Sequence, residues 1–215
     1  MLTPRSHSAM HAPRLPLLRA TDLTLAFDGH RVFSGLGFAL RPGLTLVRGG
    51  DGRGKTSLLR MLAGERQPDA GVIERAHGPA FLAAPRGTGE DEALTLRAWL
   101  QAQRAAHAGW QQPACADLVD AFGLAEHLDK SLFMLSTGTR RKGLLAAAFA
   151  SGADLTLLDT PAAALDTRSC ALLWALLEEA AGHPRRAFVL ADHALPRALE
   201  GCTLAGLVDL DQASG

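Results

Sequence analysis

The stretch Gly49-Gly50-Asp51-Gly52-Arg53-Gly54-Lys55-Thr56 decides the fold, because it satisfies the pattern G-x-x-x-x-G-K-[ST]. An apolar run over residues 44–47 precedes it and predicts a strand buried on both faces. A helical pattern follows over residues 55–63 and ends at Gly64. Glycines let the backbone curl so that N–H groups point inward, and the helix N-terminus adds the positive end of its dipole. Strand, loop and helix together predict a phosphate-binding site.

Three residues carry the chemistry predicted for this site. Lys55 is predicted to reach the β- and γ-phosphates of a nucleotide, and the Thr56 hydroxyl to ligate Mg²⁺. Asp159 ends a buried apolar run over residues 155–159, and with Lys55 upstream we interpret it as the carboxylate that holds Mg²⁺ through its water shell. The predicted metal ligands are thus Thr56 and Asp159. The predicted nucleotide-binding residues of the loop are Gly49, Gly50, Asp51, Gly52, Arg53, Gly54, Lys55, Thr56 and Ser57.

The rest of the chain alternates strand and helix patterns. Residues 23–27 alternate at strand period, and the turn Asp28-Gly29 and a second run over residues 31–40 follow, which predicts an antiparallel pair. Two further apolar runs, residues 187–191 and 206–210, predict strands late in the chain. Because these later strands alternate with helices, we expect them to lie parallel in the core.

A helical stretch interrupts this alternation. Residues 95–150 have mostly helical periodicity, with breaks at Pro113 and Gly123. The predicted fold class is therefore α/β: a P-loop NTPase core with an N-terminal antiparallel β region and a helical sub-domain inserted at about residues 86–150.

Composition excludes several classes of protein. The 215 residues contain 22 Lys and Arg against 22 Asp and Glu, and this balance argues against a protein that coats nucleic acid. The longest apolar run, residues 170–177, is far shorter than the roughly 18–20 residues that cross a bilayer. Three scattered cysteines without C-x-x-C spacing argue against a disulfide framework or a zinc site. Residues 1–16 contain three prolines and no acidic residue and predict a flexible tail, and residues 17–215 a single nucleotide-binding domain.

Motifs beyond the loop give the sequence a family resemblance. Leu135-Ser136-Thr137-Gly138-Thr139 opens an apolar helix, and alone it predicts only a helix N-terminus capped by Ser136. With residues 49–56 upstream and residues 159–166 downstream, however, the chain resembles an ATP-binding cassette (ABC) ATPase. The family's LSGGQ signature is matched as LSTGT, its Walker A motif as GGDGRGKT, its Walker B strand as LTLLD and its DEPTSALD segment as DTPAAALD. The agreement extends from about residue 17 to about residue 210.

The resemblance implies roles for further residues. Phe27 stands where the family places an aromatic residue that stacks on adenine, and His193 where it places the switch histidine. Two cassettes of the family close head to tail, so Ser136 and the Gly138 amide would bind the γ-phosphate of an ATP held by the partner. The implied catalytic residues are His193, Asp166 of the D-loop, and Thr160 at the position of the usual glutamate. The implied cofactors are ATP and Mg²⁺.

The resemblance also implies a function. The chain would be the ATP-binding subunit of an ABC transporter, peripheral on the cytoplasmic face of the inner membrane. It would drive or gate a separate polytopic membrane subunit through closure of a homodimer or heterodimer of cassettes. The short length and residues 33–40 are similar to those of the ATPase of the cytochrome c biogenesis haem exporter. Two rival functions stay open: a non-transport regulatory cassette that binds a soluble partner, and a P-loop kinase, which would leave LSTGT unexplained.

Several residues depart from the family pattern. Thr160 stands where the family has its catalytic glutamate, and a threonine hydroxyl is far too weak a base near neutral pH. Loss of a general base typically costs about 10²–10⁴ in rate, so we expect ATP binding with slow hydrolysis. A second interpretation, in which His193 or Asp192 replaces the base, is also open. Two further departures are the absence of a glutamine from residues 83–87 and, in the signature, Thr137 and Thr139 in place of glycine and glutamine.

Overall fold

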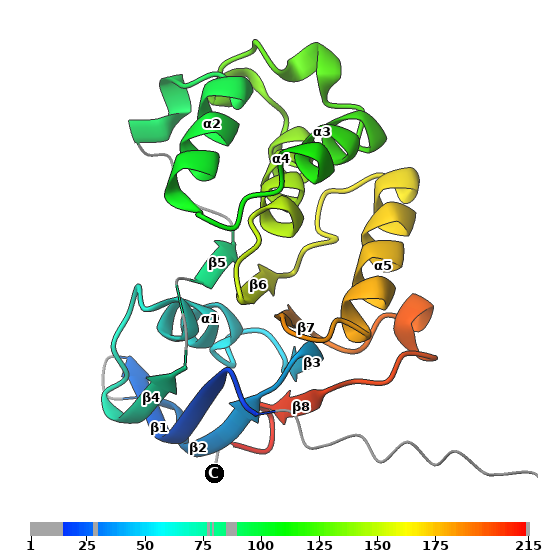
Figure 1. Cartoon of the computed structure of the whole chain (residues 1–215). Helices are drawn as coiled ribbons and strands as arrows, with labels where there is room; N and C mark the ends of the chain where they lie inside the picture. The colour runs from blue at the N-terminus through cyan, green and yellow to red at the C-terminus, as the bar shows by residue number, and fades with distance from the viewer. Residues whose placement is uncertain (1–14, 28–29, 77, 79, 85–89, 214–215) are drawn as a thin grey trace, which may run out of the picture.

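The structure is a computed structural model that describes residues 15–27, 30–76, 78, 80–84 and 90–213. The turn predicted at Asp28-Gly29 lies outside the described residues, as does most of the tail predicted at residues 1–16. Within the described part, two sheets and a group of helices build the molecule (Figure 1). The predicted α/β fold class is confirmed.

A five-stranded parallel sheet forms the centre of the molecule, in the order β5-β6-β7-β3-β8. The strands predicted near residues 44–47, 155–159, 187–191 and 206–210 are all present in it. Its strands are β3 (Gly43–Arg48), β5 (Ala80–Ala83), β6 (Leu155–Asp159), β7 (Ala187–Asp192) and β8 (Gly206–Asp209). Because all five run in one direction, their carboxyl ends meet at one edge.

A smaller antiparallel sheet holds the N-terminal strands in the order β2-β1-β4. The predicted pair is confirmed as β1 (Leu18–Phe27) and β2 (His30–Leu40). The third strand, β4 (Ala70–Arg75), was not expected from the sequence. It lies at the edge of the sheet and is mostly exposed, so its residues show no clear apolar alternation.

The predicted helix after the phosphate loop, α1, has the predicted bounds Lys55–Ala63. The helical stretch before β6 contains α2 (Leu96–Ala106), α3 (Gln112–Ala121) and α4 (Thr137–Ala150), and α5 (Thr167–Ala181) follows β6. Pro113, expected as a break, lies in the first turn of α3, where its missing N–H costs nothing. Short 3₁₀ turns span Glu90–Ala93, Ala125–His127, Leu132–Met134 and Arg197–Leu199.

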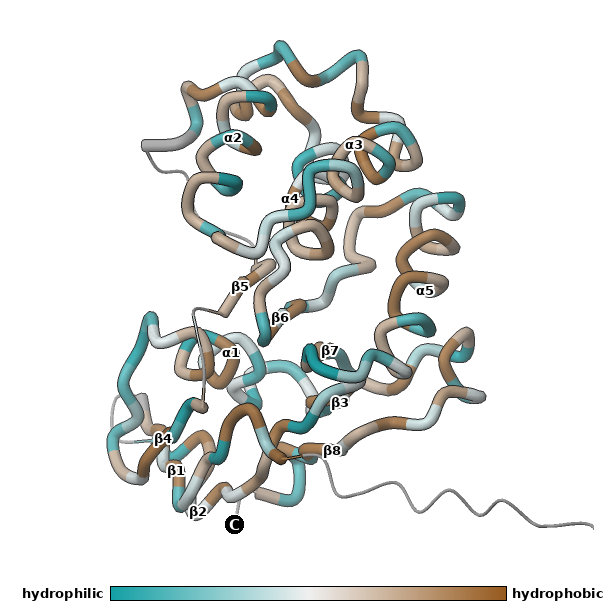
Figure 2. The backbone as a smooth tube through the Cα atoms, viewed as in Figure 1, coloured by the Kyte–Doolittle hydropathy of each residue, from teal (hydrophilic) through white to brown (hydrophobic). Residues whose placement is uncertain are grey.

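The core consists of two layers, one on each face of the parallel sheet. Along β7, Phe188 and Leu190 pack into the cluster that contains α4 and α5. Val189 and Ala191, which alternate with them, pack into the cluster that contains α1 and the antiparallel sheet. Figure 2 shows the central strands as predominantly hydrophobic, as expected for a sheet covered on both faces.

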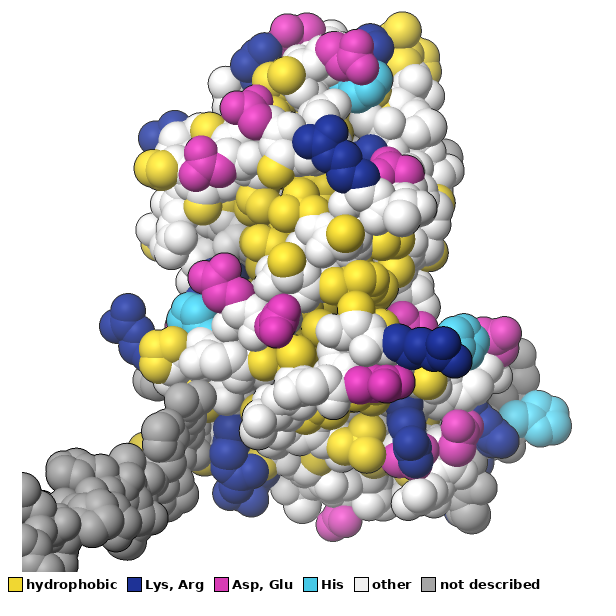
Figure 3. Space-filling model, turned by 90° about the vertical axis from the view of Figure 1, so that its right-hand side faces the viewer, with side chains coloured by type: hydrophobic (Ala, Val, Ile, Leu, Met, Phe, Trp, Pro, Cys, Tyr) yellow, Lys and Arg dark blue, Asp and Glu magenta, His cyan; other side chains and the backbone are white. Residues whose placement is uncertain are grey.

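The surface of the molecule mixes charges of both signs. Figure 3 views the side that carries α5 and shows basic and acidic side chains interspersed around a band of hydrophobic ones. This distribution agrees with the equal numbers of acidic and basic residues in the sequence. None of the helices in the described residues combines the length and hydrophobicity that a membrane span requires.

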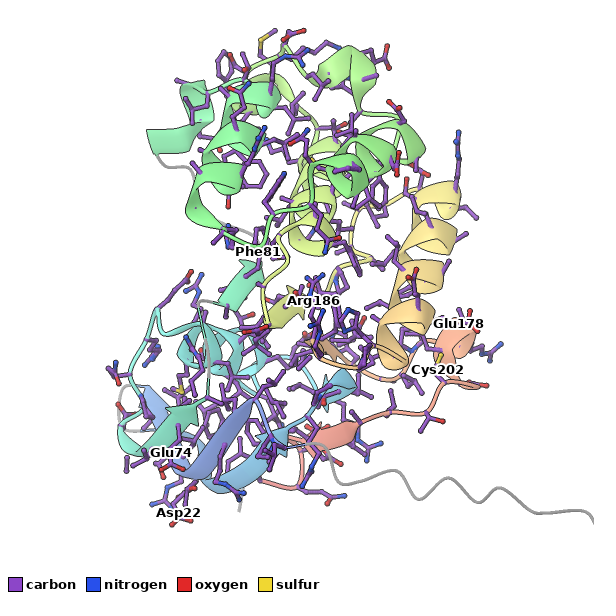
Figure 4. The ribbon with its side chains drawn as sticks, viewed as in Figure 1. Asp22, Glu74, Phe81, Glu178, Arg186 and Cys202 are labelled. Atoms are coloured by element: carbon purple, nitrogen blue, oxygen red, sulfur yellow. The ribbon has the colours of Figure 1, made fainter. Side chains whose placement is uncertain are left out.

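Arg186 fixes the carboxyl end of α4 to the sheet (Figure 4). Its guanidinium donates to the carbonyl oxygens of Ala148, Phe149 and Ala153, and to Thr156 Oγ1, over distances of 2.8–3.4 Å. The first two carbonyls belong to the last turn of the helix, where no intrahelical partner exists. Burial lowers the pKa of Arg186. These bonds hold α4, whose other end carries the signature, against β6.

Replacing Arg186 with methionine tests this anchor. Arg186→Met keeps much of the apolar volume but leaves several buried acceptors without a donor. We expect it to lower the free energy of unfolding by about 2–4 kcal/mol in chemical denaturation. Arg104→Met, at an exposed position of α2, is the matched control and should change it by less than about 0.5 kcal/mol. Equal effects of the two substitutions would contradict the anchoring role.

Candidate nucleotide-binding site

The phosphate loop, residues 49–56, connects the end of β3 to the start of α1. Gly54, the residue before the helix, has a φ of 87°, in the left-handed region that favours glycine. A Cβ there would also lie 2.7 Å from Val32 Cγ1 and 3.1 Å from the Phe33 ring. Both the backbone conformation and the close approach of β2 therefore require glycine at this position. The loop packs closely against β2 of the antiparallel sheet.

Lys55 is buried in the loop, with only 8% of its surface exposed. Its Nζ donates to the carbonyl oxygens of Gly49 (2.6 Å) and Gly50 (2.8 Å). The ammonium group thus lies inside the curl of the loop. A phosphate that enters the loop would meet a cation that is already positioned there.

Thr56 and Asp159, the two predicted metal ligands, are in direct contact. Thr56 Oγ1 donates to Asp159 Oδ2 over 2.6 Å. Asp159 is almost completely buried at the end of β6. Mg²⁺ prefers oxygen ligands and usually keeps several waters, so a hydroxyl and one carboxylate beside a phosphate-binding loop fit this ion. Within the described residues, no cluster of three or more His, Cys, Asp or Glu suggests another kind of metal site.

His193 lies beside the phosphate loop, immediately after β7. Its Nε2 is 3.5 Å from Asp51 Oδ1, and both side chains are more than half exposed. Its backbone N–H donates to Asp192 Oδ1 over 2.7 Å. The structure therefore places the predicted switch histidine against the loop, at the open side of the site.

The signature forms the amino end of α4. Ser136 Oγ caps the helix, as predicted, by accepting from the Thr139 N–H over 3.1 Å, and the two side-chain hydroxyls are 2.9 Å apart. Ser136 and Thr137 are exposed. The hydrogen bonds and ion pairs found in the described part of the chain do not join Ser136 or Gly138 to the phosphate loop. The helix terminus is open to solvent.

Further contacts bind α4 to the segment after β6. A Cβ at Gly138 would lie 2.5 Å from the Ala164 carbonyl oxygen, so the D-loop backbone approaches the signature too closely for any side chain. Lys142 Nζ is 2.6 Å from Asp166 Oδ2. Hydrogen bonds from Lys142, and then from Ser169, hold the pKa of Asp166 well below its ordinary value. Asp166 also caps α5.

Sequence reasoning missed Arg141, which reaches beneath the site from α4. Its buried guanidinium donates through Nη1 to the Asp159 carbonyl oxygen over 3.1 Å, and burial lowers its pKa. It also missed Asp211, beyond β8, which accepts from the Gly50 N–H over 3.2 Å. One sequence signal could have pointed to Asp211: it follows a parallel strand, and such strands end at the edge that carries the loop.

Thr160 has a left-handed backbone with a φ of 41°. Its N–H donates to the Ala191 carbonyl oxygen over 2.9 Å, which joins the ends of β6 and β7. A β-branched residue rarely adopts this conformation, because its Cβ substituents crowd the backbone. The residue at position 160, where the resemblance implies the catalytic glutamate, is therefore strained.

Two predicted features involve side chains or residues outside the described part of the structure. Phe27 ends β1 and pairs with His30, but its side chain is not among those described, so adenine stacking stays a prediction. Of residues 83–87, which contain no glutamine where the resemblance implies one, residues 85–87 lie outside the described residues. The roles of the other site residues in binding nucleotide and metal also stay predictions, although the geometry brings several of them together.

Comparison with known proteins gives a consistent result. The family described as "ABC transporter" matches residues 33–163. The cytochrome c biogenesis ATP-binding export protein CcmA of Alkalilimnicola ehrlichii is 42% identical over 183 residues, which cover 79% of this chain and 78% of that protein. CcmA of Hyphomonas neptunium is 35% identical, over 74% of this chain and 80% of that protein. A solved structure of an ATP-binding subunit of an ABC transporter, 22% identical, shares the fold with a TM-score of 0.73 and covers 86% of this chain and 83% of that one.

Replacing Thr160 with glycine tests the strain at this position. Thr160→Gly removes the Cβ that opposes the left-handed conformation, and we expect it to raise the free energy of unfolding by about 1 kcal/mol. Thr21→Gly, in the extended backbone of β1, should lower it instead, because glycine there only adds chain entropy to the unfolded state. Chemical denaturation measures both, and an equal loss of stability in Thr160→Gly and Thr21→Gly would show that position 160 is not strained.

Proposed function

Because this chain belongs to the ABC transporter family and is an ATP-binding subunit of that family, we propose that it serves an exporter of the cytochrome c biogenesis type. In this proposal the chain binds ATP and Mg²⁺ at an interface between two cassettes, which form a homodimer or a heterodimer. It works on the cytoplasmic face of the inner membrane and drives or gates a separate polytopic membrane subunit. The curated relative from A. ehrlichii is named as an export protein of cytochrome c biogenesis, which supports this choice of transporter.

One observation carries the proposal: Lys55, Thr56 and Asp159 converge at one edge of the parallel sheet. The Lys55 ammonium, held in place by two loop carbonyls, has a third N–H that would donate to the β- and γ-phosphate oxygens. Thr56 Oγ1 and Asp159 would hold Mg²⁺, directly and through water respectively. When bound, the metal neutralises the charge on the β- and γ-phosphates.

The open end of α4 supports dimerisation around ATP. The exposed Ser136 and the first amides of the helix, with its positive dipole end, form a suitable partner for a γ-phosphate. In the proposed dimer that phosphate belongs to the ATP held by the other cassette. His193, beside Asp51, would sense the γ-phosphate of the ATP held in this chain's own loop.

Slow hydrolysis follows from the residue at position 160. Thr160 supplies no general base, because a threonine hydroxyl is far too weak a base near neutral pH. ATP would therefore act mainly as the ligand that closes the dimer, with turnover as the slow step that reopens it. The competing interpretation assigns the base to His193 or Asp192.

The rival functions differ in their partners. A regulatory cassette would bind a soluble protein, whereas the proposed subunit would co-purify with a polytopic membrane protein. A P-loop kinase would transfer phosphate to a small acceptor rather than to water. A kinase function leaves the LSTGT segment, residues 135–139, unexplained, which favours the transporter.

Replacing Lys55 tests the nucleotide site. Lys55→Met keeps the aliphatic stem but removes the charge that meets the phosphates. Charge-assisted hydrogen bonds contribute roughly 1.5–3 kcal/mol each, so the dissociation constant for ATP with Mg²⁺ should rise about 10- to 100-fold in equilibrium titration. Lys130→Met, at an exposed position between α3 and α4, is the control and should bind as the wild type does. Unchanged binding by Lys55→Met would contradict the site.

Replacing Thr160 with glutamate tests the hydrolysis proposal. We expect wild-type phosphate release well below about 10 s⁻¹, the ordinary enzyme median, and a clear increase in Thr160→Glu. Thr160→Gln has the same shape without the base and should stay as slow as the wild type. A wild-type rate at or above the median would contradict slow hydrolysis. In that case, phosphate release measured in both Asp192→Asn and His193→Gln would show on which of the two residues the fast rate depends.

A further inference from the structure

Two aspartates at the end of β8 and just beyond it hold the phosphate loop from outside. Arg48, the last residue of β3, donates through Nη2 and Nε to one oxygen, Oδ2, of Asp209, the last residue of β8, over 2.6 Å and 2.9 Å. The other oxygen of Asp209 accepts from the Asp211 N–H over 3.1 Å, which sets the direction of the chain after the strand. Asp211 Oδ1 then accepts from the Gly50 N–H over 3.2 Å and lies 3.1 Å from Arg53 Nε. The loop is thus held before its start and at two points within it.

The contact with Gly50 acts on one peptide group. The carbonyl of Gly49 and the N–H of Gly50 belong to the same planar trans peptide, so they point in opposite directions. The carbonyl accepts from Lys55 Nζ on the inner side, and the N–H donates to Asp211 on the outer side. A Gly-Gly peptide has few steric barriers to rotation, so these two bonds fix its orientation.

We propose that Asp211 is a positioning residue for the phosphate loop, and that it acts through the Gly49–Gly50 peptide on Lys55. With Asp211 in place, the Gly49 carbonyl stays turned toward the ammonium and keeps it inside the curl. Without Asp211, the Gly50 N–H turns toward water and the Gly49 carbonyl leaves Lys55. The consequence for ATP binding rests on the proposed function, whereas the consequence for loop order does not.

The ion pair between Asp211 and Arg53 contributes less to the position of the loop than the hydrogen bond from the Gly50 N–H does. Both side chains are about half exposed, at 48% and 50%, and exposed pairs contribute little because water and salt screen them. The hydrogen bond to Gly50 instead orients a backbone group that contacts the buried Lys55. We therefore expect loop order to depend more on a hydrogen-bond acceptor at position 211 than on a negative charge there.

Three variants of the full chain separate the acceptor from the charge. Asp211→Ala removes both, Asp211→Asn keeps a carbonyl acceptor for the Gly50 N–H, and Arg53→Gln removes the ion pair alone. Hydrogen exchange of the segment 49–56, measured without nucleotide, reports loop order. Equilibrium titration with ATP and Mg²⁺ reports positioning of Lys55. Asp129→Ala removes a comparable exposed pair with Arg97, far along the chain from the loop, and is the matched control.

We expect Asp211→Ala to speed exchange in the segment about three- to ten-fold and to raise the dissociation constant for ATP by a similar factor. Asp211→Asn and the control should stay close to the wild type in both measurements, and Arg53→Gln should leave the exchange of the segment without nucleotide close to that of the wild type. Unchanged exchange in Asp211→Ala would overturn the inference, as would equal effects of Asp211→Asn and Asp211→Ala. A wild-type chain that fails to bind ATP would contradict the proposed function, while the exchange measurements would still decide the role of Asp211.

Discussion

The hydrogen bond from Thr56 to Asp159 depends on the register of the parallel sheet. The two residues are 103 positions apart. The strand that leads into the phosphate loop before Thr56, β3, and the strand that ends at Asp159, β6, are not neighbours. The strand between them, β7, brings them to one level, because Leu190 is paired with Leu46 on one side and with Leu158 on the other. Slipping either pairing by one residue would exchange the two faces of a strand and separate the hydroxyl from the carboxylate. The same register places His193 beside the loop.

Much of the fold and part of the site could be predicted because their causes are local. The phosphate loop, the helix that follows it and the cap at Ser136 each depend on a few consecutive residues. The buried strands could be predicted because both faces are covered and their apolar runs are continuous. The edge strand β4 could not, since its exposed residues carry no such pattern.

The missed residues of the site are charged side chains whose partners come from distant parts of the chain. Arg141 and Asp211 contact Asp159 and Gly50, and the second of these pairs spans 161 residues. A charged residue in a helix or after a strand is most often solvated, so its type alone predicts exposure and not a partner. Only the tertiary arrangement shows which charged side chains contact the site, because it brings the carboxyl ends of the parallel strands to the same edge.

The anchoring of α4 explains how nucleotide binding can be separated from hydrolysis. Arg186 fixes one end of this helix, and Lys142 and Arg141 bind its other end to the segment that follows β6. Thr160 lies in that segment, in a strained conformation whose N–H joins β6 to β7. These constraints act through the backbone, so they persist whatever side chain stands at position 160. The contacts predicted to bind phosphate and Mg²⁺ therefore remain assembled with a threonine at position 160, where the resemblance implies a general base.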